Sequence, residues 1–296
     1  MMTASPPQAQ INSVLALYSN GQIQAALDSV EALIKDYPND PLLYNISGIC
    51  YKTISKLDEA VKSYERALEL NPKDHATRHI LNSLLGKNSQ SAPNEYIESL
   101  FNNYAYKFDD SLVNELEYSM PSLLRKAFLD SSLANNKICK TIDLGCGTGL
   151  SGAEFRDLTE TLIGIDISAK MIAKAEEKNI YDELYVNDLI SGLKELGGKF
   201  DLFISSDVFV YVGDLEALFE TIRKHATKNA VFIFSTEDED GDSFHLQKSA
   251  RFSHSKKYIT QLASTLGFQL ICFEKSNLRK EKEQWIIGGI YILKSI

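Results

Sequence analysis

The C-terminal half of the chain alternates short apolar, β-branched runs with segments whose apolar residues recur every three or four positions. The first pattern is typical of buried strands and the second of amphipathic helices. The alternation predicts a mostly parallel sheet with helices on both faces, and the lack of a helix between the last two strands predicts an antiparallel hairpin. The predicted strands are 138–144, 161–165, 183–186, 200–205, 230–235, 268–273 and 285–293, and the predicted helices are 150–157, 169–178, 215–225 and 257–266.

A helical repeat is predicted in the N-terminal third. Small, aromatic and proline residues recur at the spacing of two interlocking helices, namely Pro41, Tyr44, Gly48, Tyr51, Ala60, Tyr64, Ala67 and Pro72. This pattern resembles a tetratricopeptide repeat, a weaker copy begins one repeat length earlier at Pro7, and a capping helix runs from His75 to near Leu85. The resemblance implies a groove for a peptide or partner protein, with a dimerisation or packing adaptor as the alternative.

Between these two regions, a polar stretch at 86–94 indicates a linker and is followed by an aromatic-rich helical segment. Most of its apolar residues are predicted to be core, and the period continues through Leu112, Leu116 and Met120. Tyr104, Tyr106 and Phe108 have a second interpretation, a lid folded over the following residues. The predicted domains are 1–88 for the repeats, 89–136 for linker and lid, and 137–296 for the α/β domain.

Composition narrows the function. With a net charge of -9, the chain is expected to repel nucleic acid, since the basic cluster at 275–282 is interrupted by acids and indicates a solvated hairpin tip. The acidic run at 237–242 indicates a solvated, mobile loop. The 4 cysteines form no CxxC pair, which favours neither a disulfide framework nor a metal site. No basic, apolar leader and no membrane-spanning run is seen, so we expect a cytoplasmic protein without membrane contact.

Three glycines follow the first predicted strand at every second position, in Asp143-Leu-Gly145-Cys146-Gly147-Thr-Gly149. Glycines let backbone approach a ligand closely, and the helix start behind them offers unpaired N–H groups. The dinucleotide fingerprint would place its third glycine at position 150, which is Leu150 here. The seven strands, terminal hairpin and glycine loop resemble the class I S-adenosylmethionine-dependent methyltransferases: an α/β, doubly wound Rossmann-like sheet with an antiparallel last strand, here preceded by a small all-α repeat domain.

The resemblance implies a cofactor site for S-adenosyl-L-methionine. Asp143 would accept hydrogen bonds from the amino side of the cofactor, while the loop of Gly145, Cys146, Gly147 and Gly149 approaches its methionine part. Tyr104 and Phe108 would cover the cofactor as the lid.

Two further acids end the next predicted strands. Asp166 can take both ribose hydroxyls, as the corresponding acid does in dinucleotide enzymes, with Ile167 and Met171 beside the adenine. Met171 is equally a plain core residue by its helical spacing. Asp188 would accept the adenine amino group with Leu189 on the ring, and its alternative role is to cap a helix at 189–193.

The fourth predicted strand borders the reactive end of the cofactor in this family. Members that methylate amide or base nitrogens carry an Asn/Asp-Pro-Pro-Tyr/Phe tetrad there; its absence weighs against DNA and many nitrogen substrates, and leaves Ser206, Asp207 and Tyr211 facing the methyl group. His254 is the first candidate base, with a helix-orienting role as its alternative and Asp207 as the other base. Arg251 would clamp a substrate carboxylate or neutralise the acidic run.

Bacterial fusions of a repeat module with a methyltransferase domain carry an Arg-aromatic-x-His-Ser stretch similar to residues 251–255, and a Tyr-Ala-x-x-Phe-Asp lead similar to residues 104–109. The resemblance covers most of residues 7–296, and these fusions are themselves known mostly by prediction. The leading hypothesis is therefore a methyltransferase (EC 2.1.1.-) acting on a small-molecule, carrier-bound or protein acceptor, which the repeats help to recruit. One rival is a non-catalytic, cofactor-binding repeat adaptor, and a second is a nicotinamide-dependent oxidoreductase.

Overall fold

The structure is a computed structural model and describes residues 6–106, 108–110, 117–135, 137–281 and 284–296. The predicted core residues Leu112 and Leu116, and Lys282 of the basic cluster, lie outside these ranges. The chain divides into two compact units. The first comprises residues up to Ser89 with Gln247–Ala250, and the second comprises Gln90–Leu246 with Arg251–Ile296.

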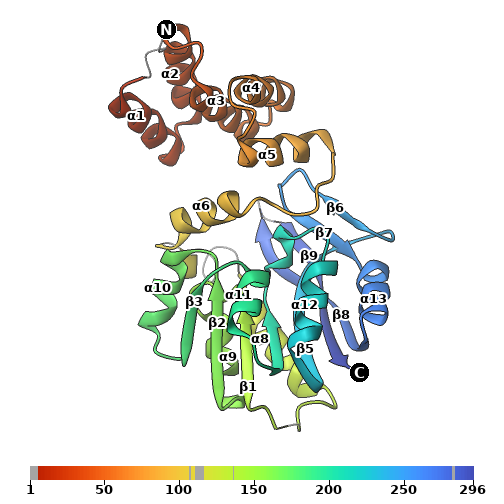
Figure 1. Ribbon diagram of the computed structural model, residues 1–296. Coiled ribbons are helices and arrows are strands. Elements are labelled where there is room, and N and C mark those ends of the chain that lie inside the picture. The colour runs from red at the N-terminus through yellow and green to blue at the C-terminus, as the bar shows by residue number, and fades with distance from the viewer. Residues whose placement is uncertain (1–5, 107, 111–116, 136, 282–283) are drawn as a thin grey trace. The chain divides into compact units, whose positions relative to one another are not determined.

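The first unit is a run of antiparallel helices: α1 (Gln8–Ser19), α2 (Ile23–Asp36), α3 (Pro41–Thr53), α4 (Leu57–Leu70) and α5 (His75–Leu85) (Figure 1). Asp40 and Asp74 begin α3 and α5 by accepting hydrogen bonds from Leu42 N (3.0 Å) and Thr77 N (2.9 Å). A Cβ on Gly48 would lie 2.7 Å from the ring of the fully buried Tyr64, so only glycine lets α3 and α4 approach this closely. The predicted repeat helices are therefore present.

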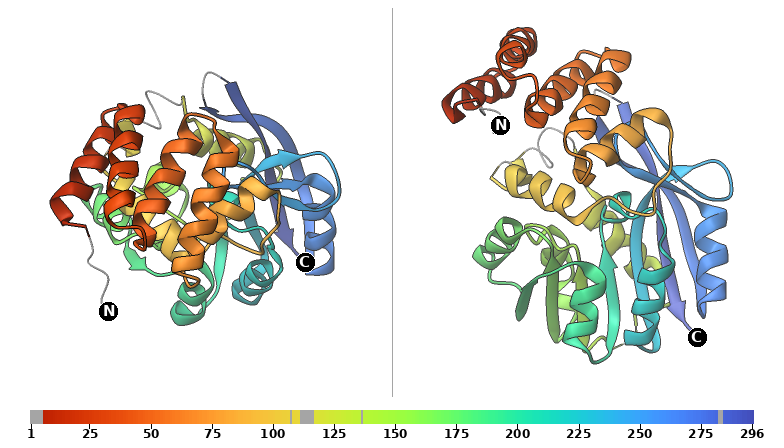
Figure 2. Two further views of the ribbon diagram at one scale, coloured as in Figure 1. Left: turned by 90° about the horizontal axis from the view of Figure 1, so that it is seen from above. Right: turned by 45° about the horizontal axis from the view of Figure 1, so that its top comes forward.

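The second unit is built on one mixed sheet of nine strands in its described part. The parallel order is β3 (Glu183–Val186), β2 (Thr161–Asp166), β1 (Lys140–Leu144), β4 (Phe200–Ser205) and β5 (Ala226–Glu239). β9 (Gln284–Ser295) pairs antiparallel with β5, and β8 (Phe268–Glu281) pairs antiparallel with β9. β9 therefore lies between β5 and β8, and the antiparallel pairing of β8 with β9, drawn in dark blue in Figure 2, confirms the predicted terminal hairpin.

Helices cover both faces of this sheet. α11 (Leu189–Leu196), α12 (Glu216–His225) and α13 (Lys256–Thr265) contribute to one apolar core. α8 (Met120–Asp130) and α9 (Leu150–Phe155) contribute to the other. The remaining helices are α6 (Asn94–Tyr104), α7 (Phe108–Asp110) and α10 (Ala169–Glu177), with 3-10 turns at Arg156–Leu158 and Phe209–Tyr211. Among the described helices, none combines the length and the apolar character that crossing a membrane requires.

Two strands were not predicted, β6 (Phe244–Leu246) and β7 (Phe252–Ser255). They form a hairpin whose second strand pairs in parallel with the end of β5, at Glu237–Glu239. β6 has only three residues, and all four residues of β7 are buried, so no period-two alternation marks either strand. The seven predicted strands are all present, and this hairpin adds two strands where a loop was expected.

The two charged runs were also misread in part. β5 extends through Glu237, whose residue is only 6% exposed, so this end of the acidic run is buried strand and not a solvated loop. β8 extends through the basic cluster, where Arg279 is 7% exposed and not at a solvated tip. Opposite charges meet here: Arg279 pairs with Glu237, which is what permits both groups to be buried.

Candidate active site

The glycine loop lies between β1 and α9, where the carboxyl ends of the parallel strands meet. Gly145 and Gly147 have φ values of +74° and +54°, which favour glycine. A Cβ on Gly145 would lie 2.5 Å from Val208. Among the described residues, only Phe108 would lie within 4 Å of a Cβ on Gly147, at 3.8 Å. Because Gly147 also lines a cavity, a side chain there would occupy space that the loop leaves open.

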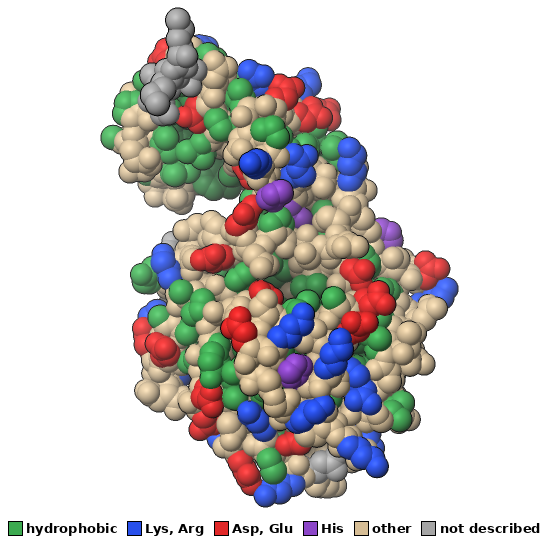
Figure 3. Space-filling model, in the orientation of Figure 1, with side chains coloured by type: hydrophobic (Ala, Val, Ile, Leu, Met, Phe, Trp, Pro, Cys, Tyr) green, Lys and Arg blue, Asp and Glu red, His purple; other side chains and the backbone are tan. Residues whose placement is uncertain are grey.

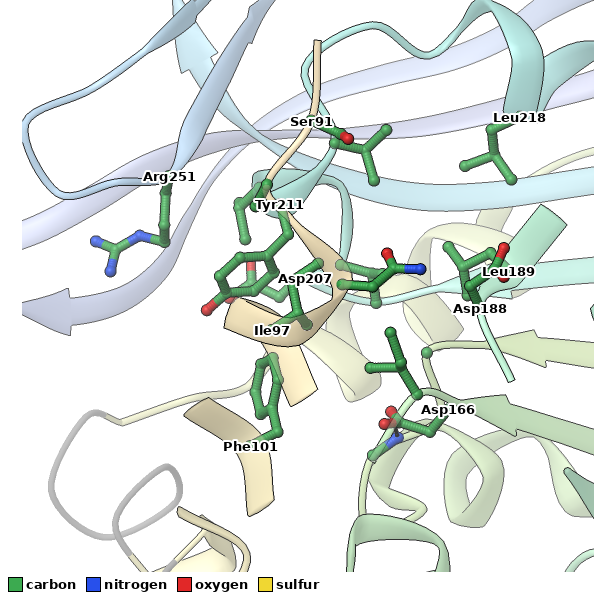
Figure 4. A pocket seen from close by; sticks show the side chains of 18 of the residues that line it. Ser91, Ile97, Phe101, Asp166, Asp188, Leu189, Asp207, Tyr211, Leu218 and Arg251 are labelled. Atoms are coloured by element: carbon green, nitrogen blue, oxygen red, sulfur yellow. Dashed lines mark hydrogen bonds between the residues drawn. The ribbon is translucent and has the colours of Figure 1, made fainter. Parts of the chain in front are cut away.

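That cavity has a volume of about 920 Å³ and lies within the second unit. In Figure 4, Arg251 and Tyr211 lie on one side of it and Asp188 with Leu189 on the other, while Ile97 and Phe101 come from α6. Eleven predicted site residues line it together: Tyr104, Phe108, Gly145, Gly147, Asp166, Ile167, Asp188, Leu189, Ser206, Asp207 and Tyr211.

Two carboxylates at strand ends also shape the backbone around the cavity. Asp166, at the end of β2, accepts hydrogen bonds from Gly147 N (2.9 Å) and Ser168 N (2.8 Å), one on each oxygen. Burial raises the pKa of Asp166. Asp188 accepts from the first backbone amides of α11, so it has the capping role that was its alternative, and it lines the cavity as well.

Five predicted site residues do not line the cavity: Asp143, Cys146, Gly149, Met171 and His254. The Tyr181 hydroxyl donates to Asp143 Oδ2 (2.7 Å), and burial raises the pKa of this carboxyl to about 7. Met171 is fully buried, which agrees with its alternative interpretation as a core residue. Cys146 is buried too, and Gly149, with φ +91°, begins α9 beside Tyr181.

Side chains that sequence analysis missed support the predicted reactive end. Tyr118 shares a 2.8 Å hydrogen bond with Ser206 and lines the cavity beside it. Phe101 of α6 meets the ring of Tyr211 edge to face, with centroids 5.4 Å apart. Phe108 contacts Phe101 and Tyr104 in the same manner. Phe101, Tyr104, Phe108 and Tyr211 thus form one continuous apolar wall of the cavity. Tyr106, also predicted for the lid, is 76% exposed and does not line the cavity.

Asp207 is held in an uncommon conformation at this end. Its φ is +61°, and its backbone N–H donates to Ser235 Oγ (2.9 Å). The Arg279 guanidinium pairs with Asp207 Oδ2 and with Glu237, and Arg251 donates to Glu237 at 2.7 Å. Both arginines line the cavity, and the described residues offer no hydrogen-bond partner to the buried Asp207 Oδ1.

Comparison with known proteins decides the family. A family model for a methyltransferase domain matches residues 135–286, just over half of the chain. The chain belongs to the methyltransferase domain family. A tetratricopeptide repeat model matches residues 41–74, so the chain joins such a repeat to a methyltransferase domain.

The names of relatives of the chain give different methyl acceptors. The chain is 37% identical over 70 residues to the 18S rRNA (guanine-N(7))-methyltransferase of Bos taurus, covering 24% of this chain and 25% of that protein. It is 27% identical over 143 residues to the malonyl-[acyl-carrier protein] O-methyltransferase of Bacillus anthracis, covering 47% and 52%. The matches thus span about a quarter to a half of these relatives. A solved S-adenosylmethionine-dependent methyltransferase from Clostridium acetobutylicum is 18% identical, with a TM-score of 0.47, covering 66% of this chain and 99% of that one.

Membership of this family confirms S-adenosylmethionine as the predicted cofactor, and the site fits it. Gly147 leaves open the space that a Cβ would fill. Asp166 and Asp188 present carboxylates to the same cavity from neighbouring strand ends. The residues present are therefore of the kind that an adenosyl ligand needs.

His254, the first candidate base, is fully buried on β7 and does not line the cavity. Its Nε2 lies 2.9 Å from the carbonyl oxygens of both Val212 and Gly213, so this nitrogen carries the proton and donates to them. Burial lowers the pKa of His254 to about 4, against the raising effect of the two carbonyls. The contacts are those of a residue that holds the segment after Tyr211 in place.

We predict that His254 makes stability depend on pH. Its folded pKa, about 4, lies below the reference value of 6.5, so the unfolded chain binds the proton first. Its stabilising contribution is complete above pH 6.5 and is lost as pH falls towards 4. Between pH 7 and 5, the free energy of unfolding, measured with urea, should fall by about 2 kcal/mol more in the wild type than in His254→Gln. The exposed His75→Gln is the control; a wild-type loss no larger than that of His254→Gln would contradict the prediction.

Proposed function

We propose that the second unit transfers a methyl group from S-adenosylmethionine to an acceptor bound in the same cavity, and that the repeat unit recruits the acceptor or its carrier. One observation carries the proposal: the glycine loop, the strand-end carboxylates and the Asp207–Tyr211 end all face one cavity of about 920 Å³. This volume is near the upper end for ligand pockets, so it suits a cofactor together with part of an acceptor.

In this proposal, Asp166 holds the ribose and Asp188 with Leu189 holds the adenine. Gly145 and Gly147 supply bare backbone to the methionine part, at the positions where a Cβ would clash or protrude. When bound, the cofactor supplies a methyl group on a positively charged sulfur, which an in-line nucleophile displaces. Asp143 does not line the cavity, so in this proposal it supports the glycine loop without contacting the cofactor, and the Tyr181 hydroxyl donates a hydrogen bond to its carboxyl.

The residues of the chain contribute alignment and exclusion of water. Phe101, Tyr104 and Phe108 form the wall that separates the reacting end from solvent. Asp207 and Tyr211 face the nucleophile, and Arg279 fixes the direction of the Asp207 carboxylate. Asp207 therefore replaces His254 as the group that we assign to the acceptor's proton, since it lines the cavity and His254 does not.

The acceptor's class is the finer part of the proposal. The names of the relatives include ribosomal RNA and an acyl-carrier protein, so the expected exclusion of nucleic acid has no support from them. On the face shown in Figure 3, lysine and arginine side chains are interspersed with acidic ones. We favour a small-molecule, carrier-bound or protein acceptor, because the cavity lining combines six carboxylates with only two arginines.

Titration calorimetry with S-adenosylhomocysteine and NAD, followed by a methyl-release assay, tests this function. We expect micromolar or tighter binding of S-adenosylhomocysteine, no competition from NAD, and transfer of labelled methyl groups. Binding without turnover on any acceptor fraction would favour the repeat adaptor. Preference for NAD would overturn the methyltransferase site and favour the oxidoreductase.

A further inference from the structure

The unpaired oxygen of Asp207 indicates what kind of atom is methylated. Oδ2 of this carboxylate is occupied by Arg279, whereas the buried Oδ1 has no hydrogen-bond partner among the described residues. The backbone is pinned by Ser235 at a φ of +61°. A buried acceptor atom without a partner is costly, and an uncommon backbone conformation beside it is a feature of functional sites.

Such an oxygen selects its counterpart by chemistry. An ionised carboxylate only accepts hydrogen bonds, so its counterpart must be a nucleophile that carries hydrogen. A carboxylate nucleophile would meet like charge, and guanine N7 is itself an acceptor with no hydrogen to offer. The Asp207 side of the cavity therefore disfavours the acceptor atom named for the relative from Bos taurus.

Amines and hydroxyl groups both carry hydrogen, and two observations favour the amine. First, a hydroxyl must lose its proton as it attacks, whereas an amine can lose its proton before the attack. Within the described ranges no histidine lines the cavity to take that proton, and Asp207 is already paired with Arg279. Second, the linked carboxylates of Asp207, Glu237 and Glu281 outnumber the guanidiniums of Arg251 and Arg279 by three to two. This surplus favours a cationic group nearby.

We propose, on the basis of the proposed function, that the acceptor is an aliphatic amine whose nitrogen is oriented by Asp207 Oδ1. The amine binds as an ammonium ion and first releases one proton, which passes by way of Asp207 to solvent. The neutral nitrogen then uses its own lone pair to form the new N–C bond, and the electron pair of the broken C–S bond remains on sulfur. The product leaves as a methylated ammonium ion. The missing Asn/Asp-Pro-Pro-Tyr/Phe tetrad agrees with this, because that tetrad accompanies amide and base nitrogens, whose lone pairs are delocalised.

Matched probe sets on the unmodified full chain test the proposal. One set is 2-phenylethylamine, 2-phenylethanol and 3-phenylpropanoate, and the other is hexylamine, hexanol and hexanoate. Binding is measured in saturating S-adenosylhomocysteine, and turnover with methyl-labelled S-adenosylmethionine. We expect each amine to bind at least about tenfold more tightly than its alcohol and acid, a difference of about 1.4 kcal/mol, and to be the only methylated member. An alcohol or acid that equals or exceeds its amine in both sets would overturn the proposal.

Two variants locate the effect. Asp207→Asn should abolish the preference for amines while retaining affinity for S-adenosylhomocysteine. Glu220→Gln removes the same charge from the cavity lining, on α12, and should leave the preference unchanged. An unchanged preference in Asp207→Asn would contradict the role of Asp207, and the probe sets decide the acceptor class even if this variant fails to fold. Failure of the wild type to bind S-adenosylhomocysteine would instead contradict the proposed function itself.

Discussion

Replacing Asp166 with alanine should weaken the binding of S-adenosylhomocysteine by at least about 100-fold, or about 2.8 kcal/mol. Two losses combine in this variant. The proposed ribose hydroxyl bonds disappear, and so does the acceptor that Gly147 N and Ser168 N now share. Hydrogen bonds to a charged group contribute about 1.5–3 kcal/mol each, so either loss alone would be measurable. The same substitution therefore removes both the hydrogen bond that holds the glycine loop at Gly147 and the proposed partner of the ribose.

Calorimetric titration of the purified variant measures this effect, with thermal unfolding to verify the fold. Asp157→Ala is the matched control, since its carboxylate is 64% exposed, pairs with Arg125 and is absent from the cavity lining. The control should bind S-adenosylhomocysteine as the wild type does. An Asp166→Ala variant within about threefold of wild-type affinity would show that the ribose is held by another residue.

The parts of the site that the sequence predicts are those that depend on local patterns. Three alternate glycines after an apolar run predict the loop, because the backbone conformation at Gly145 and Gly147 is a property of those residues themselves. Asp166 and Asp188 follow apolar strands, and parallel strands bring such ends to one edge. The aromatic spacing of α6 likewise predicts the wall over the loop.

What the sequence does not predict depends on contacts between distant segments. Arg279 reaches the cavity because β8 changes register between Asn277 and Arg279, which leaves two consecutive residues, Leu278 and Arg279, buried. An alternating pattern would have placed one of them in solvent. No motif marks Tyr118, which lies between Leu116 and Met120 of the predicted helical period. The charge of Arg279 was read locally, as part of a basic run, although its partners lie 72 and 42 residues away.

His254 shows that local patterns can also predict a catalytic residue that does not line the cavity. Its residue type and its place in a polar stretch favour a catalytic base, and no local feature distinguishes that role from a buried orienting one. The distinction comes from β7, a strand of four buried residues that directs the imidazole to the carbonyls of Val212 and Gly213. A residue with suitable chemistry therefore predicts a catalytic role only when the strand or helix that carries it is also predicted.

Replacing Arg279 with methionine should lower the free energy of unfolding by about 3–5 kcal/mol, because it leaves buried carboxylates without their partner. The Arg279 side chain is 8% exposed, and those of Asp207 and Glu237 are 13% and 9% exposed. Glu237 keeps Arg251, whereas Asp207 keeps no other ion pair among the described contacts. The penalty should therefore fall mainly on the Asp207 carboxylate, and methyl transfer should fall with it.

Urea unfolding of Arg279→Met, Asp207→Asn and the double variant measures this coupling. The double variant should be more stable than Arg279→Met alone, since its neutral amide would replace the carboxylate that Arg279→Met leaves charged and unpaired. Lys174→Met is the control: its ion pair with Glu177 is exposed, and its loss should cost less than about 0.5 kcal/mol. Additive losses in the double variant would mean that Arg279 stabilises the sheet without holding Asp207, and the direction of the Asp207 carboxylate would then need another cause.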